Sequence, residues 1–218
     1  MDLAPPIGET GHDFFRRARA RLTLNVPAAL DDHAAPATRG DLDLDPSLWE
    51  RAGVKATRPA AVLVPVVDRP EPAVLLTLRT ELPSHPGQIA FPGGKIDPHD
   101  PTPAAAAVRE AGEEIGLAPA LIEPIGYLDL YLTFSGYRIL PTVARVRPDY
   151  ELVLSEAEVA DAFEVPLAFL MDAENHALHS RDWKGIERKY YAMPFGERYI
   201  WGVTAGILRN LYERLYLA

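Results

Sequence analysis

The sequence predicts an α+β fold in which helices flank a mixed sheet. Short apolar runs at 60–67 and 73–79, separated by turn residues, indicate two strands joined as a hairpin. A strongly amphipathic segment at 103–115 indicates a helix, because its apolar residues recur at helical spacing. Strands and helices that are intermixed without strict alternation favour a mixed sheet over a purely parallel one.

The remaining elements follow from the same periodicity. Further strands are expected at 88–91, 125–132, 137–146 and 188–193, and further helices at 12–24, 155–171 and 198–217. The helix at 155–171 is expected to break near Pro166. Along the last helix a stripe predicts a face that packs in the core, formed by Ile200, Val203, Ile207, Leu211 and Leu215.

The length of the chain favours one main domain with additions. At roughly 150 residues per domain, 218 residues is too short for two large domains. We expect residues 1–56 to form an N-terminal helix and an irregular extension that packs on the main domain. Residues 57–218 are expected to form that main domain.

Charge and composition exclude several classes of protein. The chain has 22 Lys and Arg against 31 Asp and Glu, a formal charge of −9, which disfavours a protein that holds nucleic acid through phosphate contacts. A short basic cluster on the first helix is interpreted as a solvated helix face rather than a nucleic-acid site; it comprises Arg16, Arg17, Arg19 and Arg21.

The lack of cysteine and of long apolar runs excludes several kinds of site and a membrane-spanning helix. The chain has no cysteine, which rules out disulfides, thiolate zinc sites and a cysteine nucleophile. No run approaches the roughly 18 apolar residues of a membrane span, and the first residues lack a signal-peptide pattern. A cytoplasmic protein that binds no membrane is the default expectation.

The helix expected at 103–115 has clear end signals and two distinct faces. Thr102 can cap it, Pro103 fits its first turn, and Gly116 stands where it would end. Apolar residues fall on one side: Ala104, Val108, Ala111 and Ile115.

Three carboxylates, those of Glu110, Glu113 and Glu114, fall on the opposite side of this helix. Near the negative end of the helix dipole they repel one another, so a cation is expected beside them. Carboxylate oxygens suit Mg²⁺ or Mn²⁺, and a Gly-Gly turn at Gly93 and Gly94 would let a backbone carbonyl approach a metal. A solvated acidic face is the alternative, although the glycine turn and the helix-interrupting Gly112 favour a functional site.

The segment REAGEEIGL, residues 109–117, resembles the core of the Nudix box. The pattern is Gly, five residues, Glu, seven residues, then Arg-Glu-U-x-Glu-Glu-x-Gly-U with U aliphatic. Two departures are visible: Asp100 stands where the pattern has Glu, and eight residues rather than seven separate it from Arg109. The matching positions are Gly94, Arg109, Glu110, Glu113, Glu114, Gly116 and Leu117.

The resemblance implies an α/β/α sandwich and hydrolysis of a nucleoside diphosphate linked to another group. It implies Mg²⁺ or Mn²⁺ held by Glu110, Glu113, Glu114 and the Gly94 carbonyl. The implied catalytic residues are Glu110 and Glu114, together with Arg109, which orients the glutamates. The general base is left open among Glu110, Glu156 and Glu158.

A second resemblance concerns the substrate. Residues 75–94, LLTLRTELPSHPGQIAFPGG, are similar to the signature that precedes the box in the coenzyme A pyrophosphatase subgroup, although the spacer is shorter and lacks a basic residue beside Leu82. The matching positions are Leu75, Leu76, Thr77, Arg79, Thr80, Gly87, Ile89, Phe91, Pro92, Gly93 and Gly94. The implied substrate-binding residues are Arg79, Phe91 and Gly93. Arg79 could grip the 3′-phosphate of coenzyme A, or it could be an ordinary surface arginine.

The roles of several other side chains have two possible interpretations. His85 and His99 flank the glycine turn and could contact phosphate or be ordinary loop residues. Tyr131, Phe134 and Tyr137 could contact adenine or pantetheine, or could serve only in packing.

The resemblances together imply a metal-dependent hydrolase that cuts coenzyme A or its thioesters to 3′,5′-ADP and 4′-phosphopantetheine or its acyl form. The alternatives are a Nudix hydrolase for another substrate, such as NADH or ADP-ribose, and a nucleotide-binding Nudix module without turnover. The expected partner is a small nucleotide, and a homodimer is left open.

Overall fold

The computed structural model describes residues 9–32, 39–41, 43–44, 57–80, 87–183 and 186–217. Within these residues, nine strands form one mixed sheet and three more form a second, antiparallel sheet. The strands of the large sheet are β1 (Arg39–Gly40), β2 (Arg58–Val67), β3 (Ala73–Arg79), β4 (Ile89–Ala90), β5 (Gly93–Lys95), β6 (Ile122–Tyr127), β7 (Tyr131–Leu132), β8 (Tyr137–Val146) and β9 (Val159–Pro166). The small sheet consists of β10 (Ala177–Trp183), β11 (Ile186–Phe195) and β12 (Arg198–Trp201).

The helices are α1 (Gly11–Arg21), α3 (Pro103–Ile115), α4 (Leu167–Leu170) and α5 (Val203–Tyr212), which continues into a π-helical turn, η4 (Glu213–Leu217). Short 3₁₀ turns lie at η1 (Ala28–Leu30), η2 (Pro119–Leu121) and η3 (Ala173–Asn175). No helix in the described part of the chain is long and apolar enough to cross a membrane.

Strands β2 and β3 lie in the interior of the large sheet. β2 runs parallel to β8, whereas β3 is antiparallel to β9 along most of its length. The predicted hairpin of β2 and β3 forms, but the two strands pair only at Val66–Val74 and Val67–Ala73. Both sheet faces are covered, which explains why these strands are continuous apolar runs rather than alternating ones.

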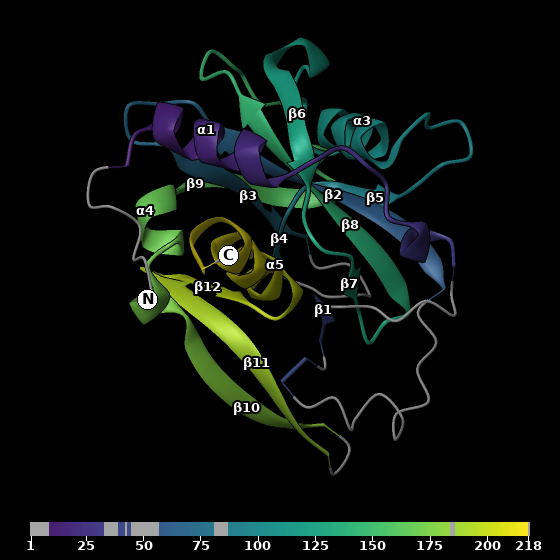
Figure 1. Ribbon diagram of the computed structural model, residues 1–218, viewed down its shortest axis with the longest axis vertical. Helices are drawn as coiled ribbons and strands as arrows, with labels where there is room; N and C mark the ends of the chain where they lie inside the picture. The colour runs from purple at the N-terminus through teal and green to yellow at the C-terminus, as the bar shows by residue number, and fades with distance from the viewer. Residues whose placement is uncertain are drawn as a thin grey trace.

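Helices cover both faces of the large sheet, as Figure 1 shows. On one face, α3 packs against Ala61, Leu63 and Leu75. On the other face, α1 and α5 share a core with Val64 and Val74. The α+β class and the α/β/α sandwich, with a mixed sheet and flanking helices, are therefore confirmed.

The small sheet packs beside α5 on the side away from α3 (Figure 1). Met193 of β11 and Ile200 of β12 are fully buried in the core that α5 also enters. The small sheet therefore forms a fourth layer, packed against the C-terminal helix.

Two predicted helices are corrected by the structure. Residues 155–171 form a turn, then β9 and the short α4, and the helix expected at 198–217 begins only at Val203. Pairing with β3 explains the first error, because the paired residues lie 80 to 93 positions apart in the chain. Gly202 explains the late start of the last helix. Its φ of 64° is a turn conformation that ends β12 before α5 begins. The apolar stripe of the last segment is nonetheless in the core, since Ile200, Ile207, Leu211 and Leu215 are buried.

The N-terminal helix contributes to the main core. Phe14 and Phe15 of α1 lie in the same cluster as α5. The predicted division of the chain at residue 56 lies outside the described residues and stays a prediction.

Candidate active site

Helix α3 has the predicted ends. The hydroxyl of Thr102 accepts a hydrogen bond from the backbone N–H of Ala105 at 3.1 Å, and Pro103 occupies the first turn. Gly116 adopts the left-handed conformation, with a φ of 67°. The apolar face is buried through Ala104, Ala111 and Ile115, while Glu110 and Glu114 of the same helix lie against the glycine turn.

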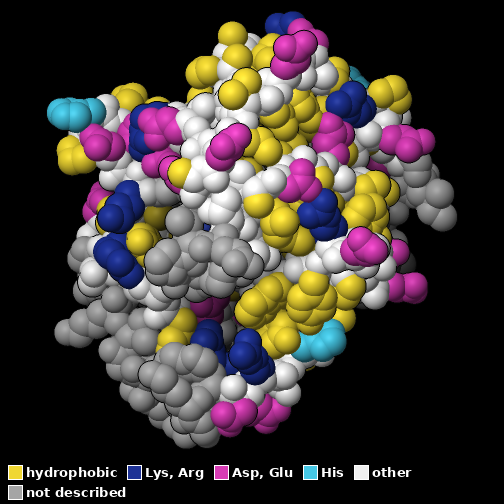
Figure 2. Space-filling view, turned by 180° about the vertical axis from the view of Figure 1, so that it is seen from behind, with side chains coloured by type: hydrophobic (Ala, Val, Ile, Leu, Met, Phe, Trp, Pro, Cys, Tyr) yellow, Lys and Arg dark blue, Asp and Glu magenta, His cyan; other side chains and the backbone are white. Residues whose placement is uncertain are grey.

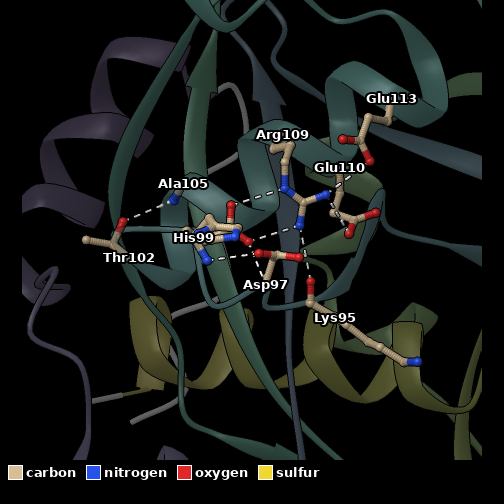
Figure 3. Close-up of polar contacts among 9 residues, drawn as sticks. Lys95, Asp97, His99, Thr102, Ala105, Arg109, Glu110 and Glu113 are labelled. Carbon is tan, nitrogen blue, oxygen red and sulfur yellow. Dashed lines mark hydrogen bonds and ion pairs between the residues drawn. The ribbon is translucent and has the colours of Figure 1, made fainter.

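Arg109 joins the loop before α3 to the acidic face (Figure 3). Its Nη1 donates to Glu110 and to Glu113, each at 3.0 Å. Its Nη2 also donates to the carbonyl of Lys95 in β5 at 3.2 Å. The hydrogen bond to Asp100 raises the pKa of Arg109, and those to Glu110 and Glu113 add to this shift, so its charge is fixed. Arg109 therefore contacts both Glu110 and Glu113, and its role in orienting them stays a prediction.

Asp100, the unusual residue of the box, is the main partner of Arg109. Its two carboxylate oxygens accept from Nε at 3.1 Å and Nη2 at 3.0 Å, which is a bidentate pair. The Arg109 guanidinium lowers the pKa of Asp100 through this hydrogen bond. The extra residue between Asp100 and Arg109 is accommodated in the connecting segment and does not separate the two side chains.

Glu114 is a buried carboxylate with few partners. It is 4% exposed, and its oxygen accepts a 3.3 Å hydrogen bond from the backbone N–H of Gly93. Burial raises the pKa of Glu114 to about 7, and the charges of Glu158 and Glu110 add to this shift. The charge of Arg79 acts in the opposite direction and lowers the pKa of Glu114.

Glu110 lies against the backbone of the glycine turn. A Cβ atom on Gly94 would stand 2.7 Å from both of its carboxylate oxygens. Burial raises the pKa of Glu110, and the hydrogen bond from Arg109 opposes that shift. Gly94 therefore leaves the space that Glu110 occupies, which is a packing reason for this glycine.

The three box glutamates are not equivalent. The side chain of Glu113 is 59% exposed and is held by Arg109, whereas Glu114 points inward. In the part of the chain that the structure describes, no three acidic or histidine side chains stand in a ready metal-binding arrangement. Arg109 instead donates hydrogen bonds to two of the three box carboxylates, those of Glu110 and Glu113.

A cleft of about 940 Å³ lies between the large sheet, α5 and the small sheet. Seen from behind in Figure 2, the surface is hollowed, with Lys and Arg side chains beside the opening and acidic atoms visible within it. Among the predicted site residues, those that line the cleft are Arg79, Phe91, Gly93, Gly94, Glu110, Glu114, Tyr131, Phe134, Tyr137 and Glu158.

Other predicted residues lie elsewhere. Of the described residues, Arg109, Glu113, Glu156 and His99 are not part of the cleft lining, and His85 lies outside the described residues. The two candidate glutamates of the 155–159 turn are thus distinguished, because Glu158 lines the cleft and Glu156 does not. Phe91 is only 5% exposed and packs mainly in the core.

The sequence reasoning missed the opposite wall of the cleft. That wall is basic and aromatic and comes from the small sheet, through Arg181, Arg188, Lys189, Tyr190 and Trp201. The only signal was the segment at 188–193, predicted as a strand without a partner. The short β1 was also missed; it pairs with β7 and brings Asp41 to Tyr131, whose hydroxyl donates to that carboxylate at 3.1 Å.

The comparisons with known proteins agree with the motif. The sequence model of the NUDIX domain matches residues 57–187. A relative from Escherichia coli K12, named uncharacterized Nudix hydrolase NudL, is 40% identical over 155 residues, which are 71% of this chain and 81% of that protein. The protein of the same name from Escherichia coli O7:K1 has the same identity and coverage.

Solved structures are more distant. An Ap4A hydrolase from C. elegans in a binary complex has a TM-score of 0.41 at 22% identity, covering 50% of this chain and 80% of its own. The NUDIX domain of Shewanella oneidensis NrtR, complexed with ADP ribose, has a TM-score of 0.41 at 20% identity, covering 56% and 84%. The family match and the 40% identity together establish that this chain belongs to the NUDIX domain family and is a Nudix hydrolase of nucleoside diphosphate derivatives.

Proposed function

We propose that the chain hydrolyses the pyrophosphate bond of coenzyme A or acyl-coenzyme A. The observation that carries this proposal is that the segment resembling the coenzyme A signature and the box glutamates line one cleft. From the signature-like segment, the cleft is lined by Arg79, Phe91 and Gly93. From the box, it is lined by Glu110 and Glu114. At about 940 Å³ the cleft is at the upper end of the roughly 300–1,000 Å³ of ligand pockets, which suits a substrate larger than a mononucleotide.

The residues present fit divalent cations, Mg²⁺ or Mn²⁺. Glu114 is buried with one long hydrogen bond, and Glu110 and Glu158 raise its pKa further, so this end of the cleft has an excess of negative charge. Hard oxygen donors of this kind are the preferred ligands of both ions. Glu110, Glu113, Glu114 and the Gly94 carbonyl would hold the ions, which would polarise phosphoryl oxygens and activate a water.

Two arginines of the chain would orient the glutamates and bind the substrate. Arg109 is a positioning residue that fixes Glu110 and Glu113 from behind, since it does not line the cleft. Arg79 lines the same cleft as Glu114, and its guanidinium would contact the diphosphate of a bound substrate.

The hydrolytic step requires one general base. A water oxygen forms a bond to a phosphorus of the anhydride, the bridging P–O bond breaks, and the proton of the water passes to a carboxylate. Glu110 and Glu158 both line the cleft, which favours them over Glu156 for this role. The products are 3′,5′-ADP and 4′-phosphopantetheine, or its acyl form.

A panel of substrates tests the proposal. Purified protein with Mg²⁺ or Mn²⁺ is incubated with coenzyme A, acetyl-coenzyme A, NADH and ADP-ribose, and the products are separated by chromatography. We expect coenzyme A or its thioester to have the highest kcat/KM. A higher kcat/KM for NADH or ADP-ribose would mean that this compound, rather than coenzyme A, is the substrate. Binding of these compounds without hydrolysis of any of them would indicate a nucleotide-binding module.

A further inference from the structure

We propose that Asp41 is a positioning residue for the adenosine half of the substrate. Its carboxylate holds Phe134 and Arg188 together at one end of the cleft, where the adenine base packs against them. The inference rests on the proposed function, because it assigns one half of that substrate to a part of the same cleft. Asp41 and Arg188 both lie outside residues 57–187, which the family model matches.

The carboxylate of Asp41 connects three elements around the cleft. One oxygen accepts from the hydroxyl of Tyr131 in β7 at 3.1 Å, and the other accepts from the backbone N–H of Phe134 at 2.7 Å. This second oxygen also lies 3.8 Å from a guanidinium nitrogen of Arg188 in β11. The side chain of Asp41 is only 13% exposed, so these contacts are partly shielded from solvent and salt.

Arg188 provides a flat surface in the cleft rather than an anion site. Its charge is already opposed by Asp41, and its guanidinium carbon lies 3.9 Å from the centre of the Phe134 ring. A guanidinium over an aromatic ring forms a stack, and both of these groups line the cleft. Phe134 follows β7 of the large sheet and Arg188 belongs to the small sheet. The stack therefore joins the two sheets at this end of the cleft, and Asp41 holds both of its members.

The face of the small sheet that carries Arg188 also carries aromatic rings. Residues two apart in a strand share a face, which places Tyr190 on the same side of β11 as Arg188. Trp201 opposes Ala192 and therefore projects from this face, with its ring centre 5.4 Å from that of Tyr190. Both rings line the cleft. A planar base suits such a wall, whereas pantetheine is a flexible chain without a ring.

This end of the cleft is remote from the glycine turn and the box glutamates. Gly94 belongs to β5, which pairs with β2, and the sheet continues through β8 and β7 to β1, which directly precedes Asp41. Four strand spacings therefore separate β5 from β1, or about 19 Å along the sheet at an ordinary spacing of about 4.8 Å. A diphosphate at Gly94 and the glutamates does not extend that far, so the end at Asp41 receives another part of the substrate.

Equilibrium titration with small ligands tests this assignment independently of turnover. With Mg²⁺ present, the wild-type chain is titrated with AMP, with ribose 5-phosphate, which lacks the base, and with 4′-phosphopantetheine, the other half of the substrate. The same titrations are made on Asp41→Asn, on Arg188→Gln and on the double variant. Asp149→Asn is the matched control, because Asp149 also pairs with an arginine, Arg147, but is exposed and does not line the cleft.

We expect wild type to bind AMP at least about tenfold more tightly than ribose 5-phosphate, which is within the range of one stacked base. Asparagine keeps one acceptor oxygen but loses the charge that holds Arg188. Asp41→Asn should therefore bind AMP about tenfold more weakly than wild type, the equivalent of one hydrogen bond, with the affinities for the other two ligands unchanged. Asp149→Asn should bind all three as wild type does.

The double variant shows whether Asp41 acts through Arg188. Arg188→Gln should weaken AMP binding as Asp41→Asn does, and the double variant should lose no more than either single variant, because both changes break the same contact. Losses that add fully in the double variant would overturn the positioning role.

Three further results would overturn the proposal. The first is equal wild-type affinity for AMP and ribose 5-phosphate, and the second is an Asp41→Asn variant that retains the preference for AMP. The third is a loss in Asp41→Asn that weakens all three ligands equally, which would mean that Asp41 only supports the fold. A selective loss of 4′-phosphopantetheine binding would likewise refute the assignment of the adenosine half to this end.

The panel of substrates separates these results from the proposed function. Coenzyme A turnover without a preference for AMP would refute the base site alone. A preference for AMP that depends on Asp41, without coenzyme A turnover, would support the base site and refute the proposed function.

Discussion

The carboxylate of Glu110 occupies the space that a side chain on Gly94 would need, with both oxygens 2.7 Å from the position of a Cβ atom. Gly94→Ala should therefore force Glu110 to rotate away from the glycine turn. Because Glu110 is a flexible side chain, we expect little change in melting temperature but a fall in kcat of about 100-fold, as for a catalytic group displaced by about 1 Å. Thermal denaturation and steady-state kinetics measure the two effects, and an unchanged kcat would refute the packing argument.

Gly112→Ala is the matched substitution two residues beyond Glu110 in the same helix. A Cβ atom at residue 112 would meet only the carbonyl oxygen of Leu117, at an ordinary contact distance of 3.7 Å. Since alanine favours the helix over glycine by about 1 kcal/mol, the free energy of unfolding should rise by about that amount. Urea denaturation measures the gain, and a loss of stability would mean that Gly112 has a packing role.

Arg109→Lys tests the positioning role of the guanidinium. A lysine ammonium cannot donate in a fork to Asp100 while it also reaches Glu113, so the glutamates lose their common support. We expect kcat to fall by about tenfold or more and the Mg²⁺ concentration for half-maximal rate to increase.

The control for that substitution is Arg147→Lys. Arg147 also forms a two-bond pair with a carboxylate, that of Asp149, but on the exposed surface. Its replacement should change neither the rate nor the Mg²⁺ dependence. An Arg109→Lys enzyme with the Mg²⁺ dependence of wild type would show that Arg109 only stabilises the fold.

His176 should make the stability depend on pH. Its Nε2 donates to the carbonyl of Leu170 at 2.7 Å, and its Nδ1 accepts from Arg209 at 3.3 Å, an arrangement that requires a neutral ring. Burial lowers the pKa of His176, and the nearby Arg209 charge adds to this effect.

The unfolded chain therefore binds a proton at a higher pH than the folded one. This contribution to stability is fully present above the ordinary pKa of 6.5 and is lost as the pH falls below it toward the lowered value. Chemical denaturation between pH 5 and 7.5 should give a flatter profile for His176→Gln than for wild type. The exposed His12→Gln should follow wild type, and identical profiles for all three proteins would contradict the prediction.

Local signals were enough to predict helix α3 and its acidic face. Thr102, Pro103 and Gly116 act within one turn of the helix ends, so their effect can be read without knowledge of the fold. The central strands were also predictable, since burial on both faces leaves a continuous apolar run.

The features that could not be predicted depend on pairing between segments that are distant in the sequence. β9 contains Glu and Ala residues that favour a helix, but its pairing with β3 makes it a strand. The basic wall arises because β11 pairs with β10 and lies beside α5, and neither partner follows from the local sequence. The contact between Asp100 and Arg109 likewise depends on how the loop before α3 folds back.

The rate of coenzyme A hydrolysis by Glu114→Gln at saturating Mg²⁺ tests the central claim most directly. Glutamine keeps the shape of the side chain and can still accept the hydrogen bond from Gly93, so the melting temperature should not decrease. Because the buried negative charge is lost, we predict that kcat falls by about 1,000-fold or more. A variant that releases 3′,5′-ADP at nearly the wild-type rate would contradict the assignment of this end of the cleft as the active site.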